Sequence, residues 1–274
     1  MMRTATAAEV AQMLDWAAEE GWNPGLDDAA AFAAADPDGF FVAEQDGQPV
    51  AAISVVNHSD SFAFLGLYLC QPAHRGRGIG YALWQHALAH AGERTVGLDG
   101  VAAQQDNYAR SGFVKTGATT RFEGACQTRS STSLRPVTPA DLNALADLDR
   151  AANGFDRPRF LNAWLTDTDT RKTIIQVAGD RVTGFATARL CRQGCKVGPV
   201  ITQDLDAAQR LAHAAAGALG ANSMIIDVPE TQPALQSALR DNRFDATFET
   251  ARMYKGPAPV AGKGLFAVAT LELG

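Results

Sequence analysis

A glycine-rich segment at Arg75 to Gly80 is the feature that most restricts how this chain can fold. It lies between an apolar extended run, residues 62–70, and an apolar helical run that ends near residue 91. Glycine permits backbone conformations and close approaches that a side chain would block. A turn of this kind directs several backbone N–H groups to one point beside a helix N-terminus, and that arrangement binds phosphate or pyrophosphate. The segment therefore predicts a strand, an anion-binding turn and a helix, in that order.

The order of predicted elements occurs twice along the chain. In the first half we expect helices at residues 6–20, 27–35, 78–91 and 104–111, and strands at residues 3–6, 40–44, 50–56, 62–70, 95–99 and 114–124. In the second half we expect helices from residue 138 and at 156–165, 206–219 and 233–240, and strands at 134–137, 173–178, 182–190, 196–201, 224–228, 246–253 and 265–273. A polar linker is expected at residues 128–133. The repeat predicts an α/β protein with two tandem domains, residues 1–127 and 134–274, each a mixed, mostly antiparallel sheet flanked by helices.

The composition of the chain disfavours several classes of protein. The formal net charge is −6 without a basic run, which disfavours nucleic acid as a partner. No stretch approaches the ~18 apolar residues of a membrane span, and the first residues lack the apolar core of a secretory signal. The four cysteines lack zinc-ligand spacing, so we expect no metal and free thiols in a reducing cytoplasm. We therefore expect a cytoplasmic protein that is a monomer or a homodimer.

The known phosphate-binding loops differ in where they require glycine and lysine. A Walker loop needs Gly-Lys-Ser or Gly-Lys-Thr, which is absent here, and the dinucleotide pattern G-x-G-x-x-G fails at Tyr81 or Leu83. What remains is Arg-x-x-Gly-x-Gly, from Arg75 to Gly80, followed downstream by Tyr-x-x-x-Gly-Phe, from Tyr108 to Phe113. In this order and at this distance, the two motifs resemble the coenzyme A site of the GNAT superfamily of N-acetyltransferases.

The resemblance covers residues 1–125 and implies an acyl-CoA-dependent N-acyltransferase with acetyl-CoA as co-substrate. The coenzyme-binding residues that it implies are Leu69, Cys70, Gln71, Arg75, Gly76, Arg77, Gly78, Ile79, Gly80, Tyr81, Gln105 and Tyr108. Val101 stands where many relatives carry an asparagine that touches the pantetheine arm, and Gln104, Gln105 or Asn107 are candidates to replace it. The second half resembles a degenerate GNAT-like domain of bacterial tandem proteins. Its equivalent turn, residues 200–206, lacks glycine and arginine and ends in acidic residues. We therefore expect one coenzyme per chain.

The family mechanism is direct transfer from a thioester to an amine, so it needs a proton acceptor, an oxyanion donor and a proton donor. By position, Tyr108 is the candidate catalytic residue that protonates the departing thiolate, unless it only packs under the coenzyme. A backbone N–H near Leu69 or Cys70 is the candidate oxyanion donor. Three residues are open alternatives for the base: Asp99, Glu123 and His58. Cys70 has no evident histidine partner, so a small apolar role is expected rather than a covalent acyl-enzyme.

The acceptor site of GNAT folds lies near the first two helices, where this chain has Trp22, Asn23 and Asp27. An aromatic ring beside carboxylates suits a cationic amine. Trp164 and Tyr254 are further candidates for the same cleft. The function expected is N-acetylation of a primary amine on a small molecule. The alternatives are a protein or peptide N-acetyltransferase, and a non-catalytic acyl-CoA-binding sensor.

The end of the chain raises a separate question. GNAT domains usually end in a two-strand hairpin, but the first half offers only one good strand there, residues 114–124. We hypothesise that residues 265–273 pair with or cover the open edge of the first sheet, because an uncovered edge invites aggregation. The alternative is that this segment completes the hairpin of the second domain.

Overall fold

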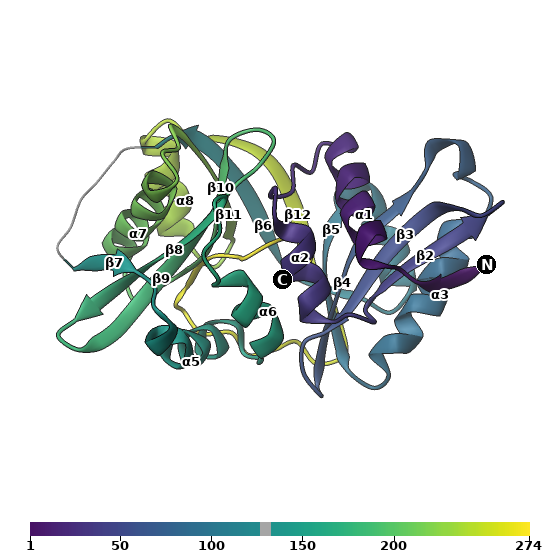
Figure 1. Cartoon of the computed structure of the whole chain (residues 1–274), viewed down its shortest axis with the longest axis horizontal. Coiled ribbons are helices and arrows are strands. Elements are labelled where there is room, and N and C mark those ends of the chain that lie inside the picture. The colour runs from purple at the N-terminus through teal and green to yellow at the C-terminus, as the bar shows by residue number, and fades with distance from the viewer. Residues whose placement is uncertain (127–132) are drawn as a thin grey trace.

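A computed structural model describes residues 1–126 and 133–274, and it shows two α/β halves joined side by side (Figure 1). The predicted linker, apart from Ser133, lies outside the described residues, so the division of the chain at this point stays a prediction. In the described ranges, no helix combines the length and apolar character needed to span a bilayer.

The first half contains six strands and four α-helices among its described residues. The strands are β1 Met2–Thr4, β2 Phe40–Gln45, β3 Gln48–Asn57, β4 Phe62–Cys70, β5 Thr95–Val101 and β6 Val114–Ala125. The helices are α1 Ala7–Glu19, α2 Asp28–Ala35, α3 Ile79–Ala91 and α4 Gln105–Arg110, with short 3-10 turns at Pro72–His74 and Ala102–Gln104. A capping box starts α1, because Thr6 and Glu9 exchange side-chain and backbone hydrogen bonds.

The second half follows the same order of elements. Its strands are β7 Leu134–Pro136, β8 Arg171–Ala178, β9 Arg181–Leu190, β10 Cys195–Ile201, β11 Ser223–Pro229, β12 Asp245–Lys255 and β13 Leu265–Ala267. Its helices are α5 Leu142–Asn153, α6 Pro158–Trp164, α7 Leu205–Ala218 and α8 Pro233–Asp241, and a 3-10 turn at Pro139–Asp141 precedes α5.

The two halves exchange strands. Among the described residues all thirteen strands form one sheet in the order β1-β2-β3-β4-β5-β12-β6-β11-β10-β9-β8-β7, with β13 against β10. β12 of the second half lies between β5 and β6, while β6 of the first half lies between β12 and β11. Each half therefore supplies a strand to the other, and the two sheets expected from the sequence are joined into one mixed, mostly antiparallel sheet.

The sheet opens at two equivalent places. β4 and β5 are parallel partners only from Phe62 to Leu65, and β10 and β11 only at Lys196 and Val197. A register shift interrupts β4 against β3, and Leu67 has a positive φ of 47° there. Such a bulge bends the strand and leaves part of its edge unpaired. Each half thus contains a pair of strands that separate like a fork.

The end of the chain fills the fork of the second half. β13 pairs with β10, and the N–H of Val268 donates to the carbonyl oxygen of Asp227 on β11, at 3.0 Å. The predicted pairing of this segment with the first sheet is therefore wrong, and β12 is the strand that completes that sheet, but residues 272 and 273 do contact the first half at Gly66 and His58. The predicted strand at 265–273 was also too long, because only Leu265–Ala267 is extended and paired.

One apolar core runs through both halves. It contains buried residues of α1, α2 and α6, together with part of the chain end. Phe32 of α2 stacks on Trp164 of α6 with ring centroids 6.3 Å apart, and these two helices lie next to each other at the centre of Figure 1. Since burial of one aromatic side chain contributes roughly 2–3 kcal/mol, the halves stabilise each other substantially.

Candidate active site

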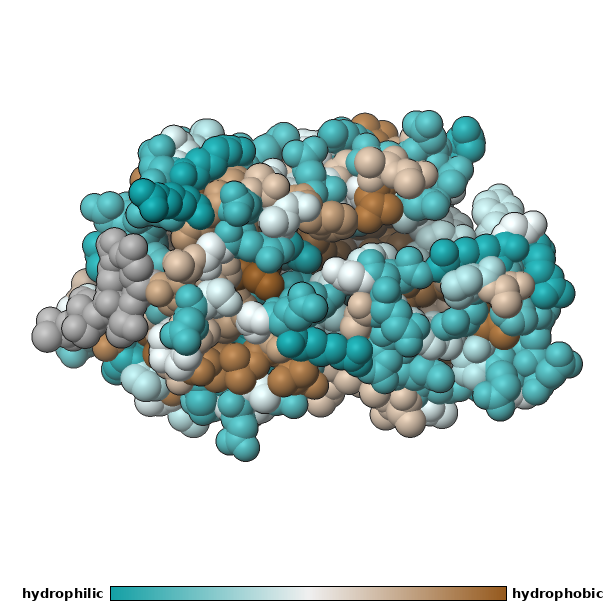
Figure 2. Space-filling view, turned by 90° about the horizontal axis from the view of Figure 1, so that it is seen from above, coloured by the Kyte–Doolittle hydropathy of each residue, from teal (hydrophilic) through white to brown (hydrophobic). Residues whose placement is uncertain are grey.

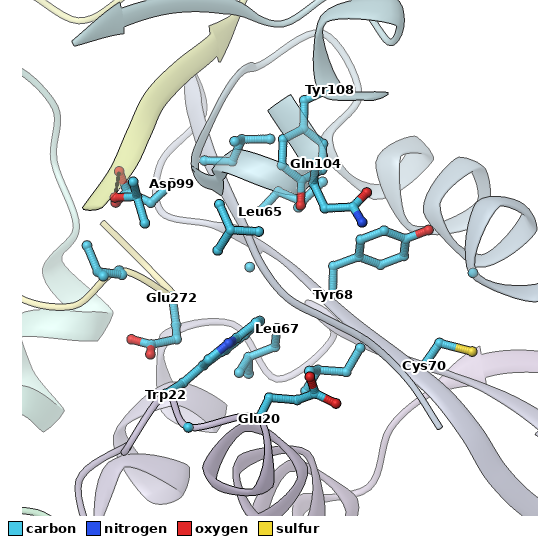
Figure 3. A pocket seen from close by; sticks show the side chains of 18 of the residues that line it. Glu20, Trp22, Leu65, Leu67, Tyr68, Cys70, Asp99, Gln104, Tyr108 and Glu272 are labelled. Carbon is cyan, nitrogen blue, oxygen red and sulfur yellow. Dashed lines mark hydrogen bonds between the residues drawn. The ribbon is translucent and has the colours of Figure 1, made fainter. Parts of the chain in front are cut away.

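A cavity of about 700 Å³ occupies the fork between β4 and β5. Its lining comes from the end of α1, β4, the glycine turn, β5, β6, β12 and the chain end. Figure 2 shows one face of the molecule, hollowed near the centre of the view, and Figure 3 shows side chains that line the cavity. A smaller cavity of about 420 Å³ adjoins it between α3 and α4 and shares Tyr68, Tyr81 and Tyr108 with it. The site is therefore a long channel rather than a closed pocket.

The glycine turn forms one end of this channel. Gly76 and Gly78 have φ angles of +72° and +77°, and a Cβ at either would meet nothing within 4 Å. Left-handed backbone and free space together are what a close-approaching anion requires. A Cβ on Gly80 would lie 2.8 Å from the Tyr68 hydroxyl, so a side chain there would require Tyr68 to shift. The N-terminus of α3 adds its partial positive charge at this point.

Two arginines flank the glycine turn. Arg75 donates from Nε to the carbonyl oxygen of Cys70 at 2.8 Å, and its guanidinium pairs with Glu20 at the end of α1. Arg77 is not among the lining residues and lies 3.4 Å from His74 Nδ1. The turn is thus fixed to β4 by Arg75, and both positive charges remain near the place where an anion would bind.

Most of the residues expected to bind the coenzyme line the cavity. Those that line it are Leu69, Cys70, Arg75, Gly76, Gly78, Ile79, Gly80, Tyr81 and Tyr108, and those that do not are Gln71, Arg77 and Gln105. Gln105 donates to the carbonyl oxygen of Gly100 at 3.2 Å, whereas Gln104 reaches the cavity beside Val101. Of the alternatives for the missing asparagine, Gln104 lines both cavities, Asn107 lines only the smaller one, and Gln105 lines neither.

Tyr108 lies on α4 with its hydroxyl directed into the cavity (Figure 3). Its ring stacks on Trp84, with centroids 5.2 Å apart and planes 12° apart, and only 8% of the residue is exposed. Burial, assisted by Tyr68, raises the pKa of the Tyr108 phenol above its usual value. The group therefore stays protonated at neutral pH and can donate a hydrogen bond into the cavity.

The bulge in β4 offers backbone groups to the cavity. Pairing with β5 ends at Leu65, and the next residues of β4, through Cys70, all line the cavity. Preorganised N–H groups on such an edge are the usual device for stabilising an oxyanion. Cys70 itself is half-buried, and burial raises the pKa of its thiol, which is the opposite of what a nucleophilic cysteine needs.

The three base candidates differ in what already binds them. Asp99 accepts two hydrogen bonds from Arg252, at 2.9 and 2.7 Å, and Glu123 accepts one from Thr247 at 2.8 Å. His58 lies outside the cavity lining and its Nε2 bonds the carbonyl oxygen of Leu273 at 2.8 Å. Burial lowers the pKa of His58 to about 3, with the positive Arg157 adding to the effect.

Of the candidates for the acceptor site, only Trp22 lines the cavity. The Asn23 amide bonds the backbone of Gln193, at 2.7 and 3.2 Å, and Asp27 accepts hydrogen bonds from Thr168 and Thr170. These two side chains bridge the halves instead of facing the channel.

The two aromatic candidates from the second half also lie elsewhere. Trp164 is fully buried in the shared core and donates from Nε1 to the carbonyl oxygen of Gly198 at 3.2 Å. Tyr254 packs near Phe62, outside the lining of the cavity. Neither residue is available to contact an acceptor in the channel.

Sequence reasoning missed the cavity residues that come from far along the chain. They are Arg121 on β6, Thr247, Phe248 and Thr250 on β12, and Leu271 and Glu272 near the end. None belongs to a motif, and only the strand exchange and the path of the chain end bring them here. Arg121 pairs with Asp227 at 2.7 and 2.9 Å, so it joins the two halves under the cavity.

Within residues 1–126 and 133–274, no three His, Cys, Asp or Glu side chains are grouped so as to hold a metal ion. The four cysteines are free thiols. This arrangement can therefore bind an anion at the glycine turn and donate a hydrogen bond from Tyr108 further along the channel. The other end of the channel is lined by apolar side chains and carboxylates.

Comparison with known proteins agrees with this geometry. A family model for the "Acetyltransferase (GNAT) family" matches residues 7–117, and one for an "Acetyltransferase (GNAT) domain" matches residues 145–266. Among curated proteins, the holothin acyltransferase of Pseudoalteromonas sp. (strain SANK 73390) is 32% identical over 264 residues, which are 95% of this chain and 90% of that protein.

Solved structures show the same fold. A putative acetyltransferase from Pyrococcus horikoshii superposes with a TM-score of 0.83 at 20% identity, covering 100% of this chain and 95% of the other. A tandem GNAT protein from the clavulanic acid biosynthesis pathway gives a TM-score of 0.62 at 17% identity, covering 94% and 99%. The chain belongs to the GNAT acetyltransferase family of acyltransferases and carries two GNAT domains in tandem.

Proposed function

We propose that this protein transfers an acetyl group from acetyl-CoA to a primary amine of a small molecule. The observation that carries the proposal is the continuous cavity that connects the glycine turn, through the Tyr108 hydroxyl, to an end lined by Trp22. Such a channel holds a long, anionic thioester at one end and a second reactant at the other.

The proposal includes one coenzyme per chain. Gly76 and Gly78 leave open space beside the N-terminus of α3, where backbone N–H groups and Arg75 would bind the pyrophosphate. The corresponding fork of the second half contains β13 instead. Gly198 there lies so close to the main chain of Val268 that even a Cβ would collide with it.

The proposed reaction divides its proton transfers between the two ends of the channel. An alkylammonium with a pKa near 10.4 must first lose a proton to a base. The free nitrogen then forms a C–N bond to the acyl carbon while the C–S bond breaks. The nitrogen then loses a second proton, which reaches the departing sulfur by way of the Tyr108 hydroxyl, so Tyr108 ends neutral. The products are an amide, coenzyme A thiol and one proton released to solvent.

The shape of the acceptor end favours a small molecule over a protein. Trp22, Leu67, Phe248 and Leu271 surround it, and these come from four separate segments of the chain. The relative named holothin acyltransferase supports acyl transfer to a specific acceptor here as well. The four free thiols are consistent with our further proposal that the protein acts in a reducing cytoplasm, as a monomer or a homodimer.

The test is a screen of small primary amines with acetyl-CoA, in which thiol release and the mass of the product are measured together. Acetylation of at least one small amine, absent in a Gly78→Asp chain, is the expected result. Turnover only with peptides would show that the acceptor is a peptide or protein and not a small molecule. Tight acetyl-CoA binding without turnover on any amine would indicate a sensor. Propionyl-CoA and longer thioesters in the same screen measure the preference for acetyl.

A further inference from the structure

The last residues of the chain cross from the second half into the acceptor end of the cavity. After β13, Arg189 donates to the carbonyl oxygen of Ala269 at 3.0 Å, and three residues later the backbone of Glu272 lies directly against Gly66 of β4. Any Cβ at Gly66 would collide with that backbone. Gly66 immediately follows the point where β4 and β5 separate, so this segment reaches the base of the fork.

This segment is held firmly. Thr270 Oγ1 accepts hydrogen bonds from the N–H groups of Glu272 and Leu273, at 2.9 and 3.0 Å. The carbonyl oxygen of Leu273 is bonded by His58 Nε2 at 2.8 Å, and that of Gly274 accepts from the buried Arg157. These anchors come from both halves, and they fix the position from which the Glu272 side chain projects.

The Glu272 carboxylate differs from the other carboxylates of the cavity. Asp99 is held by Arg252, Glu123 by Thr247 and Glu20 by Arg75. Glu272 is only 5% exposed and lines the cavity, yet its carboxylate has no hydrogen-bond or ion-pair partner among the described residues. Figure 3 shows it beside Trp22, on the opposite side of Leu65 from Tyr108.

A buried carboxylate without a partner is costly unless nearby charges offset it. Arg121 and Lys196 interact electrostatically with Glu272, and each also has another partner: Arg121 binds Asp227, and Lys196 donates to the carbonyl oxygen of Trp22 at 2.8 Å. The surrounding positive charge therefore makes the buried carboxylate tolerable without occupying its oxygens. A carboxylate left free beside an aromatic face is suited to an ammonium group.

We propose that Glu272 is the catalytic residue that binds the acceptor ammonium and takes its proton before attack. The assignment rests on the proposed acyl transfer. The ammonium gives one proton to the Glu272 carboxylate, its nitrogen keeps the electron pair, and that pair forms the C–N bond as the C–S bond breaks. After attack the nitrogen loses its second proton, which reaches the departing sulfur by way of Tyr108, and Glu272 releases the first proton to water in the channel. The base thus comes from the end of the second half, while the proton donor Tyr108 belongs to the first.

The experiment compares single carboxylate-to-amide changes in the full chain, once an amine substrate of the unaltered protein is known. Glu272→Gln keeps the volume and removes the proton acceptor, so kcat should fall ~100-fold or more while the Kd of acetyl-CoA stays within about twofold. Glu249→Gln, on the exposed surface of β12, is the matched control and should keep both values.

A second variant is needed in case the Glu272→Gln change disturbs the packing of the chain end. Glu272→Asp keeps the charge beside Arg121 but withdraws the carboxylate by one methylene, and a displacement of about 1 Å can lower kcat up to ~100-fold. A folded Glu272→Asp or Glu272→Gln chain with full kcat overturns the assignment of the base and leaves the proposed function intact. The same conclusion follows if Glu123→Gln is the one variant that loses kcat. A wild-type chain that acetylates no amine overturns the proposed function, and the assignment with it.

Discussion

Arg252 of β12 donates hydrogen bonds to both carboxylate oxygens of Asp99 on β5, at 2.9 and 2.7 Å. The two residues are cross-strand partners at the place where the second half inserts its strand into the first. Asp99 also lines the cavity, so the pair links the strand exchange to the wall of the site.

Arg252→Met should destabilise the whole chain. Removing one partner of a buried ion pair leaves an uncompensated charge, which typically costs about 3–5 kcal/mol. Chemical denaturation measures the loss, and both halves should unfold in the same transition. Arg150→Met is the control, because its pair with Asp147 is solvent-exposed and contributes little. Separate transitions for the two halves would contradict the idea that β12 couples them.

Gly78→Asp should abolish coenzyme binding, because it adds a side chain and a negative charge where the pyrophosphate is expected. Gly47→Asp is a closely matched control: φ is +76° there against +77° at Gly78, and a Cβ meets nothing within 4 Å at either. Both variants carry the same backbone strain, and only Gly78 lines the cavity. Calorimetry should give one acetyl-CoA site in the control and none in Gly78→Asp. Two equivalent sites per chain would show that the second half also binds coenzyme.

Tyr108→Phe should lower kcat by ~100-fold or more with little effect on the Kd of acetyl-CoA, since it removes a donor hydroxyl and almost no volume. Burial raises the pKa of Tyr108, so the phenol remains protonated beside a leaving thiolate and can stabilise it through a hydrogen bond. Tyr254→Phe removes a hydroxyl outside the cavity and serves as the control. Single-turnover rates separate chemistry from product release, and an unchanged rate there would mean that Tyr108 only packs against Trp84.

Lowering the pH should reduce the free energy of unfolding, because His58, which anchors the end of the chain, is buried in its neutral form. Its folded pKa of about 3 lies below the ordinary value near 6.5, so the unfolded chain binds a proton first as pH falls. The stability contributed by neutral His58 is thus complete above pH ~6.5 and is lost progressively toward pH 3. The loss between pH 7 and pH 5 amounts to about 2 kcal/mol. The His58→Gln protein cannot titrate at this position. The free energy of unfolding should therefore fall between pH 7 and pH 5 by about 2 kcal/mol more in the wild type than in His58→Gln, as measured by denaturation curves at both pH values.

Residues 1–133 expressed alone should aggregate and fail to bind acetyl-CoA, because β5 and β6 then lack β12 between them. Co-expression with residues 134–274 should restore a soluble complex that binds one acetyl-CoA. Gel filtration and calorimetry report both properties. A soluble, monomeric first half with normal affinity would show that the exchanged strand is dispensable.

The sequence predicted the helices and strands well because each of them is determined mainly by residues that are close together in the chain. The capping residues Thr6 and Glu9 and the apolar run of β4 each determine their own segment. The glycine turn was identifiable for the same reason. Its glycines are required by backbone geometry, and that requirement does not depend on distant partners.

What the sequence could not reveal is which strands meet. β6 and β12 have ordinary strand patterns, and nothing in either pattern states that each pairs inside the other half. The same limit applies to Glu272, which lay in a segment predicted as a strand and belongs to no motif. Asn23 and Asp27 were expected near the acceptor because the acceptor site of GNAT folds lies near the first two helices, but their side chains bond to the second half.

The exchange of β6 and β12 has a consequence for how the protein is made. A ribosome releases β12 roughly 120 residues after β6, which at ~5–20 residues per second is a delay of about 6–24 s. During that time the nascent first half has its glycine turn but an incomplete sheet, with two unpaired edges exposed to chaperones and proteases. A stop codon before residue 245 would therefore remove β12, and we expect the glycine turn, although translated intact long before it, to lose the complete sheet that positions it.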